Sequence, residues 1–429
     1  MAYFEDVIKI RKKFMLHYKK GNYVNCISIG QKLIDLYKKH EDMGSIDYAD
    51  DLYNLACIYH ETGGFAQARP LYVESVKLVR KLLGKGISYT DRLNNLAVCI
   101  ARMGESDMAA KYLKEAAHIL VAKGYENSPQ HLETLYNLAN VYYDQGLYDE
   151  AIRQHVNVLF TRKDEGDGYS DSLNCIGYAY ERQGDLENAV NYIKRATAHI
   201  KKTHTVNSMA YLSNIYYLAQ IYIRRQDYPS AIRCYEDAQR VIRKLFNEKH
   251  PYFADTLNRL AEALENDGQW ERALRLRLRA LKIVRIQIGE QHMYYANCLR
   301  NIGLIYKTEG EKEKAVPYFL QALAIKRQII GAGNIDYIRD VMFLCGIYIE
   351  RFEYESALNI LNDTMQLLEL EGGEFDQIVP EINKIFSSLK SIQEFKENYQ
   401  TENGRPMDIA ALLKLVEDRI SEDGGISSP

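Results

Sequence analysis

The chain has 429 residues, of which 47% are apolar and 26% charged, so it can bury a large core. Only 8 prolines interrupt it, which favours long helices. The 55 basic and 58 acidic side chains leave a net charge of −3, and this balance argues against a protein that coats nucleic acid.

Several classes of protein are disfavoured by what the sequence lacks. No apolar run approaches the roughly 18–20 residues that span a bilayer, and Met1–Lys13 has no continuous hydrophobic block of the kind that begins a secretory signal. The 7 cysteines form no CxxC pair, so neither a disulfide framework nor a structural zinc site is expected. We expect a cytoplasmic protein that contacts no membrane and holds no metal or cofactor.

The chain begins with a segment that predicts two helices. Residues 3–40 carry Gly21 at their centre, and the next glycine with the same surroundings is Gly63, 42 residues later. Cys26 stands where the following units have alanine. We therefore interpret residues 1–48 as a degenerate helix pair that caps the fold.

A repeat then occupies residues 49–370. Successive alanines, counted as position 20 of each unit, are separated by 41, 42, 38, 42, 42, 42 and 42 residues. Position 8 is always small, position 7 is always Leu or Ile, and position 15 is glycine in six of the eight units. The eight alanines are Ala68, Ala109, Ala151, Ala189, Ala231, Ala273, Ala315 and Ala357.

Each of these positions has a physical reason. Positions 4, 7 and 11 lie on one face of a helix and bury an apolar stripe. Small residues at positions 8 and 20 let two helices approach closely, and glycine at position 15 ends the first helix. The unit is an antiparallel helix pair, so we predict an all-α fold, a right-handed superhelix of about nine such pairs.

The C-terminal part is acidic, with 7 Lys/Arg against 16 Asp/Glu in residues 351–429. Residues 378–399 and 408–420 read as helices, and Asp408 is a plausible N-cap for the second of them. We interpret residues 371–420 as capping helices that cover the last repeat, and residues 421–429 as a flexible tail.

The repeat positions are the signature of the tetratricopeptide repeat, and the 42-residue period resembles that of kinesin light chain and its relatives. The resemblance covers roughly residues 49–370. It is carried by HPYFADTLNRLA at 250–261, ARPLY at 68–72 and AVPYF at 315–319. Gln226 and Phe352 depart from the pattern by replacing the turn glycine, and Arg277 by occupying a usually apolar position. We see no long heptad coiled coil before the repeats, so a motor component is not expected.

The first helices of the pairs are expected to line an inner groove with positions 2, 6, 9 and 13, opposite the buried face. Amides there can hold a peptide backbone, arginines can bind carboxylates, and tyrosines supply flat contact area. The candidate groove residues are Asn54, Asn95, Arg102, Tyr136, Asn137, Asn140, Tyr178, Arg182, Tyr217, Arg224, Arg259 and Asn301.

The resemblance implies a more specific ligand. In the resembling family, groove amides and basic residues hold short cargo peptides with acidic and aromatic residues. The resemblance implies this role for Asn95, Asn137, Arg102 and Arg259, and for no other residue of this chain.

Simpler interpretations stay open for the same residues. The position-6 asparagines can instead hydrogen-bond the neighbouring repeat and stiffen the stack. The position-2 acids, such as Asp50, are expected in the first turn of their helices, where the helix dipole favours them. The basic residues between Arg272 and Arg285 are expected on a solvated outer face.

Our first functional hypothesis is a non-catalytic adaptor that binds a linear segment of a partner protein. The alternative is a peptide-responsive regulator that changes superhelix pitch and releases a client protein. Nucleic-acid binding ranks last. No HExxH, GxSxG or P-loop motif is present, so we expect no enzyme, and the sequence leaves the oligomeric state open.

Overall fold

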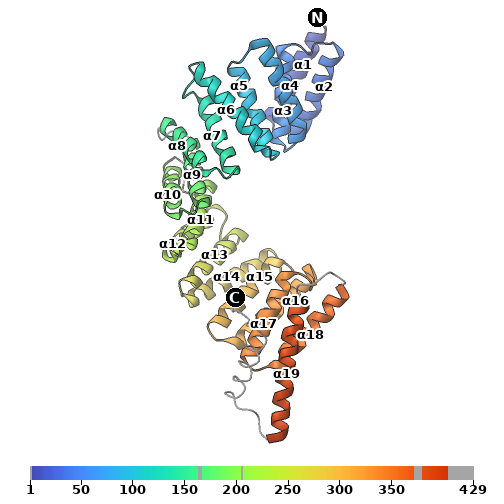
Figure 1. Cartoon of the computed structure of the whole chain (residues 1–429), viewed down its shortest axis with the longest axis vertical. Helices are drawn as coiled ribbons and strands as arrows, with labels where there is room; N and C mark the ends of the chain where they lie inside the picture. Colours follow the sequence, from blue (N-terminus) through green and yellow to red (C-terminus); the bar gives the residue numbers. More distant parts are fainter. Residues whose placement is uncertain (1, 163–166, 204–205, 372–378, 404–429) are drawn as a thin grey trace. The chain divides into compact units, whose positions relative to one another are not determined.

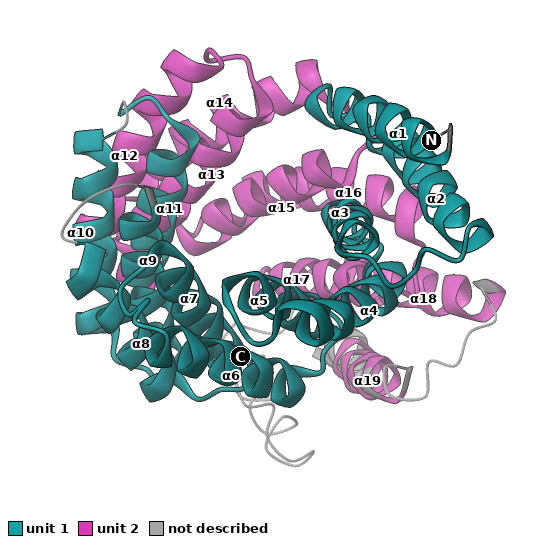
Figure 2. Ribbon diagram, turned by 90° about the horizontal axis from the view of Figure 1, so that it is seen from above, with its two compact units in different colours: residues 1–221 teal, residues 222–429 magenta. Residues whose placement is uncertain are grey.

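The computed structural model describes residues 2–162, 167–203, 206–371 and 379–403 (Figure 1). Within these ranges the regular structure consists of 19 α-helices, with no strand. The chain divides into two compact units, residues 1–221 and 222–429, shown in different colours in Figure 2. The prediction of an all-α solenoid of helix pairs is confirmed.

Unit 1 holds the first ten helices and most of the eleventh. In each pair the odd-numbered helix comes first and the even-numbered helix second. The helices are α1 (Ala2–Lys19), α2 (Tyr23–Lys39), α3 (Ile46–Glu61), α4 (Phe65–Leu83), α5 (Ile87–Arg102), α6 (Ser106–Ala122), α7 (Pro129–Asp144), α8 (Tyr148–Arg162), α9 (Asp167–Arg182), α10 (Leu186–Thr203) and α11 (Met209–Arg224).

Unit 2 continues the same alternation. Its helices are α12 (Tyr228–Leu245), α13 (Pro251–Asn266), α14 (Trp270–Gln287), α15 (Met293–Thr308), α16 (Lys312–Ile330), α17 (Ile335–Glu350), α18 (Tyr354–Glu371) and α19 (Val379–Asn403). The helix expected at 378–399 is therefore α19, whereas residues 408–420 and 421–429 lie outside the described residues.

Within each unit every helix packs on the next along the chain, from α1 to α10 and from α12 to α19. In unit 1 the first helices of successive pairs also contact one another, because α3 touches α5, α5 touches α7 and α7 touches α9. These first helices therefore form a continuous layer, and residues on its free side are neighbours across repeats.

The turn between the two helices of a pair needs a left-handed backbone. All six position-15 glycines have positive φ, between 76° at Gly146 and 86° at Gly104. No heavy atom lies within 4 Å of a Cβ built on either of these two glycines, so backbone conformation rather than space selects the residue. Gln226 and Phe352 adopt the same turn with φ of 59° and 60°, which is strained for a residue with a side chain.

The small residue at position 8 is required by close packing. A Cβ added to Gly177 would lie 2.6 Å from Cδ1 of Ile193 in the second helix of its pair. A Cβ added to Gly303 would lie 2.8 Å from the Phe319 ring. A larger side chain at this position would push the two helices of the pair apart.

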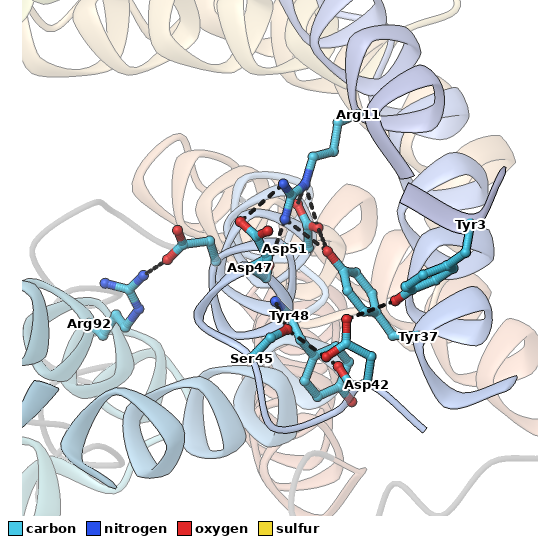
Figure 3. A network of polar contacts seen from close by, with 10 residues as sticks. Tyr3, Arg11, Tyr37, Asp42, Ser45, Asp47, Tyr48, Asp51 and Arg92 are labelled. Carbon is cyan, nitrogen blue, oxygen red and sulfur yellow. Dashed lines mark hydrogen bonds and ion pairs between the residues drawn. The ribbon is translucent and has the colours of Figure 1, made fainter. Parts of the chain in front are cut away.

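A polar network ties the first helix pair to the repeat that follows (Figure 3). The Arg11 guanidinium on α1 donates to Asp51 on α3 at 2.7 Å and to the Tyr37 hydroxyl on α2 at 2.8 Å. The Tyr37 hydroxyl in turn donates to Asp51 at 2.9 Å. Asp51 is 7% exposed, and burial raises the pKa of its carboxyl although the hydrogen bonds from Arg11 and Tyr37 favour the charged form.

Candidate functional site

A cleft of about 290 Å³ lies on the first helices of three successive pairs in unit 1. Its walls come from α5, α7 and α9, the helices that touch one another across repeats. Four of the predicted groove residues, Arg102, Asn137, Asn140 and Tyr178, meet in it. The remaining lining residues are Val98, Ala101, Val141, Tyr143, Asp144 and Cys175.

The charged groups of the cleft are exposed and uncompensated. Arg102 ends α5 and Asp144 ends α7, and neither has an ion-pair partner within 4 Å in the described part of the chain. Burial lowers the pKa of His60, and the positive charge of Arg102 lowers it further. The cleft thus combines one cation and one carboxylate with the apolar side chains of Val98 and Val141 and the amides of Asn137 and Asn140.

The asparagines of the groove make bonds between repeats. Asn137 on α7 donates from Nδ2 to Oδ1 of Asn94 on α5 at 3.2 Å, and Asn95 donates to the Tyr53 hydroxyl on α3. Asn95 and Asn137 therefore do make the hydrogen bonds between neighbouring repeats that the simpler interpretation of the position-6 asparagines expects. Asn137 keeps its Oδ1 and its second N–H hydrogen for a ligand, because a carboxamide carries two donors and one acceptor atom.

Aromatic rings form the α9 side of the site. The Tyr178 ring lies 4.4 Å from the Tyr217 ring on α11, edge to face, and the Tyr217 hydroxyl donates to Glu181. Burial raises the pKa of Tyr178 to about 12, so its hydroxyl is a neutral hydrogen-bond donor at physiological pH. This pair is a rigid, amphipathic contact surface of the kind that interfaces favour.

The cysteine in the cleft is not activated. Burial raises the pKa of Cys175 to about 11, and its thiol donates to Oδ1 of Asn140 at 3.8 Å. The Tyr136 hydroxyl lies 3.9 Å from the same sulfur. A thiol in this state is a poor nucleophile, because the reactive form is the thiolate.

The other predicted residues are not among those that line this cleft. Arg182 is exposed on α9, and its Nε donates to the Tyr148 hydroxyl at 3.3 Å. Asn54 lines a separate hollow near the N-terminus. Three belong to unit 2: Arg224 is exposed, Asn301 is half-buried, and Arg259 pairs with Asp255 of its own helix at 2.8 Å.

The sequence reasoning missed part of the cleft wall. Ala101 and Tyr143 occupy position 12 of their units and Val141 occupies position 10, outside the four positions assigned to the groove. On a helical wheel position 12 is about 100° from position 13. The inner face is therefore wider than a four-position stripe, and a wheel drawn with a broader sector would have included these residues.

One subsidiary expectation is wrong, and the expectation of a solvated basic face on α14 is wrong at Arg277, although Arg272, Arg275, Arg279, Lys282 and Arg285 are exposed. Asp50 is the fifth residue of α3, beyond its first turn, and pairs with Arg92 of the next repeat. Arg277 on α14 does not lie on a solvated face: it is 6% exposed and its Nε contacts Glu265 at 2.9 Å. Two other arginines of α14 form ion pairs, Arg272 with Glu236 at 3.3 Å and Arg279 with Glu248 at 2.6 Å. These pairs neutralise part of the positive charge of the helix.

Other kinds of site are not seen in the described residues. No group of three or more His, Cys, Asp or Glu side chains there is arranged to hold a metal ion. Among the same residues, no helix combines the length and apolar character needed to cross a bilayer.

Comparison with known proteins gives one family. Models of the tetratricopeptide repeat match residues 52–86, 89–156, 168–244 and 252–328, together more than half of the chain. A search of curated proteins found no match.

Solved structures of repeat proteins are similar at low sequence identity. A STAND signal-transduction ATPase with a tetratricopeptide repeat sensor from Pyrococcus horikoshii has a TM-score of 0.53 and 16% identity, covering 76% of this chain and 48% of that one. The C-terminal part of a TPR repeat-containing protein from Cytophaga hutchinsonii has a TM-score of 0.49 and 17% identity, covering 69% and 99%. Kinesin light chain-like repeats from Podosopora anserina have a TM-score of 0.41 and 20% identity, covering 46% and 96%. At these identities the first of the three supports the fold alone.

Proposed function

The chain belongs to the tetratricopeptide repeat family, whose repeats are protein-interaction modules, and we propose that it is a non-catalytic adaptor that binds a linear segment of a partner protein. The proposed binding site is the cleft on α5, α7 and α9. The single observation that carries the proposal is that Arg102, Asn137, Asn140 and Tyr178, chosen from the repeat pattern alone, line one cleft.

The chemistry of the cleft favours an extended peptide with a carboxylate and an aromatic side chain. Arg102 is exposed and has no anionic partner in the described residues, so a carboxylate can bind it without displacing an existing ion pair. The edge of the Tyr178–Tyr217 pair offers a surface for an aromatic ring. Asn137 and Asn140 line the same cleft, and their amides can hydrogen-bond a peptide backbone.

A rigid adaptor suits the site better than a regulator that changes pitch. The Asn137–Asn94 bond and the reciprocal bonds between Asn174 and Asn214, at 3.1 Å and 2.9 Å, join successive first helices. Asn94, Asn174 and Asn214 are each less than 10% exposed, so a change of pitch at these steps would leave buried amides without partners.

The test is selection of peptides from a display library of random dodecapeptides, followed by calorimetry on the selected peptides. We expect enrichment of Asp or Glu near an aromatic residue, with micromolar affinity, about −8 kcal/mol. Arg102→Glu should weaken binding at least tenfold. The matched control is Arg153→Glu, the same charge reversal at a 68% exposed side chain on α8, and it should leave affinity unchanged. Equal affinity in the two variants, or no enriched peptide, would refute the proposal.

A further inference from the structure

The N-terminal helix α1 has two contrasting faces. Val7 and Phe14 point into the fold and are 4% and 7% exposed. On the other side Ile8, Met15 and Leu16 are 52%, 46% and 53% exposed, although all three are large apolar residues. They line an open hollow of about 390 Å³ together with Arg11, Lys12 and Lys19. We call Ile8, Lys12, Met15, Leu16 and Lys19 the α1 face.

The α1 face lies at the groove positions of the first helix pair. When Cys26 is counted as position 20, Ile8, Lys12, Met15 and Lys19 are positions 2, 6, 9 and 13. The eight following units all have a polar or charged residue at position 2, and five of them have an acid there. At position 2 the first pair therefore replaces a polar, usually acidic side chain with the apolar Ile8, and this difference indicates a ligand different from that of the central cleft.

The positive charge of this face is not used within the chain. Lys12 and Lys19 are exposed and have no carboxylate within 4 Å in the described residues. Arg11 is different, because its guanidinium is held by Asp51 and Asp47 of α3 at 2.7 Å and 3.1 Å (Figure 3). The two lysines therefore accompany the apolar side chains with positive charges that are available to pair with carboxylates of a ligand.

The spacing of the apolar residues fits a helix. Ile8 and Met15 are seven residues apart, two helical turns or about 10 Å, which matches the repeat of side chains along one face of a second helix. A broad anionic membrane surface fits less well. The adjoining hollow shares Met15 and Arg11 but is also lined by Asp47 and Asp50, whose side chains are 56% and 49% exposed, so anionic groups border the basic face. A single helix lying along α1 contacts only the lysine side.

We propose that the α1 face binds an amphipathic helix of a partner protein, with aliphatic side chains two turns apart and Asp or Glu beside them. The aliphatic side chains cover Ile8, Met15 and Leu16, and the carboxylates pair with Lys12 and Lys19. This site is separate from the cleft on α5, α7 and α9, and it does not depend on the function proposed for that cleft.

The test uses the full chain and a synthetic 18-residue helix with leucine on one face and glutamate on the other. Binding is measured by calorimetry, and a second peptide with lysine in place of every glutamate serves as the charge control. We expect the glutamate peptide to bind and the lysine peptide not to bind. Raising the salt from 0.1 M to 0.5 M should weaken the glutamate peptide, because exposed charge pairs are screened.

Variants of α1 locate the site. Lys12→Glu with Lys19→Glu should weaken the glutamate peptide about tenfold or more, and Ile8→Gln with Met15→Gln should weaken it similarly. Lys13→Glu is the matched control, because Lys13 is exposed on α1 but does not line the hollow. All of these residues are exposed, so circular dichroism should show unchanged helix content.

Four results with peptides or vesicles would overturn the proposal. They are failure of the glutamate peptide to bind, equal binding of both peptides, equal loss with Lys13→Glu, and binding of phosphatidylserine vesicles but of neither peptide. Concentration-dependent dimerisation that is abolished by Ile8→Gln with Met15→Gln would also overturn it, by assigning the face to a second copy of the chain. Loss of dodecapeptide binding at the central cleft would leave it unaffected.

Discussion

Replacing His155 should remove an acid sensitivity from unit 1. This side chain on α8 is 1% exposed, and neither ring nitrogen has a hydrogen-bond partner in the described residues. The Tyr136 ring lies edge-on at 5.2 Å. Burial lowers the pKa of His155 to about 4, from an ordinary value of 6.5, because nothing nearby compensates the charged form.

The sign follows from proton binding. Between pH 6.5 and pH 4 the unfolded chain binds a proton at His155 and the folded chain does not, so stability falls as the pH falls through this window. At 1.36 kcal/mol per pKa unit, the loss is about 2 kcal/mol at pH 5 and about 3 kcal/mol below pH 4. His155→Leu should abolish this component, and leucine already fills the equivalent position 24 at Leu113 and Leu361, both 0% exposed.

The measurement is urea unfolding followed by circular dichroism, for the wild type and His155→Leu, at pH 8 and pH 5. The wild type should lose about 2 kcal/mol more than the variant between the two pH values. Other titrating groups, including His60 and His131, are present in both proteins and cancel in the difference. If the two proteins show the same pH dependence within about 0.5 kcal/mol, the assignment of a buried, uncompensated imidazole is wrong.

Three further substitutions test the packing. Gln226→Gly should raise the free energy of unfolding by about 0.5–1 kcal/mol, because glycine adopts the turn at φ 59° without strain. Glu265→Gln should lower it by about 2 kcal/mol or more, since Arg277 would keep a buried charge without a carboxylate. Asn137→Leu should cost about 1–3 kcal/mol by leaving the Asn94 amide without its partner, and adding Asn94→Leu should cost less than the sum of the two single changes. Each is measured by urea unfolding.

For each of these three substitutions, a second measurement tests the proposed cause of the change in stability. Gly184→Gln makes the opposite change in the equivalent turn between α9 and α10, at φ 85°, and should lower the free energy of unfolding. Glu271→Ala removes the 67%/89% exposed pair with Arg275 and should change stability by less than about 0.5 kcal/mol. Additive effects at Asn94 and Asn137 would contradict the role assigned to their bond.

The fold could be predicted from the sequence because the residues that the fold requires are determined within a single helix pair. The turn glycines and the small residues at positions 8 and 20 recur at a fixed period, and each is selected by geometry within one helix pair. The burial of Arg277 does not follow from the charge of its neighbours, which form a basic helix typical of a solvated face. It follows from the repeat, in which Arg277 occupies a usually apolar position.

The site was harder to predict than the fold. The repeat positions predict that Arg102, Asn137, Asn140 and Tyr178 face the groove, because that side follows from helical periodicity, and the four residues line one cleft. They did not identify the Asn137–Asn94 bond. That bond joins position 6 of one unit to position 5 of the unit before, and the offset between neighbouring first helices depends on how the repeats pack, which a single helical wheel does not contain.

The bonded asparagines limit how this array can be rearranged by duplication or recombination. A repeat of this kind can be copied or deleted as an independent module only if its borders carry no buried polar groups that need a partner outside it. Removing the unit that contains Asn137 would strand Asn94, and removing the one that contains Asn174 would strand Asn214. Chimeras of this chain should therefore retain folding when their junctions leave both members of each pair in place.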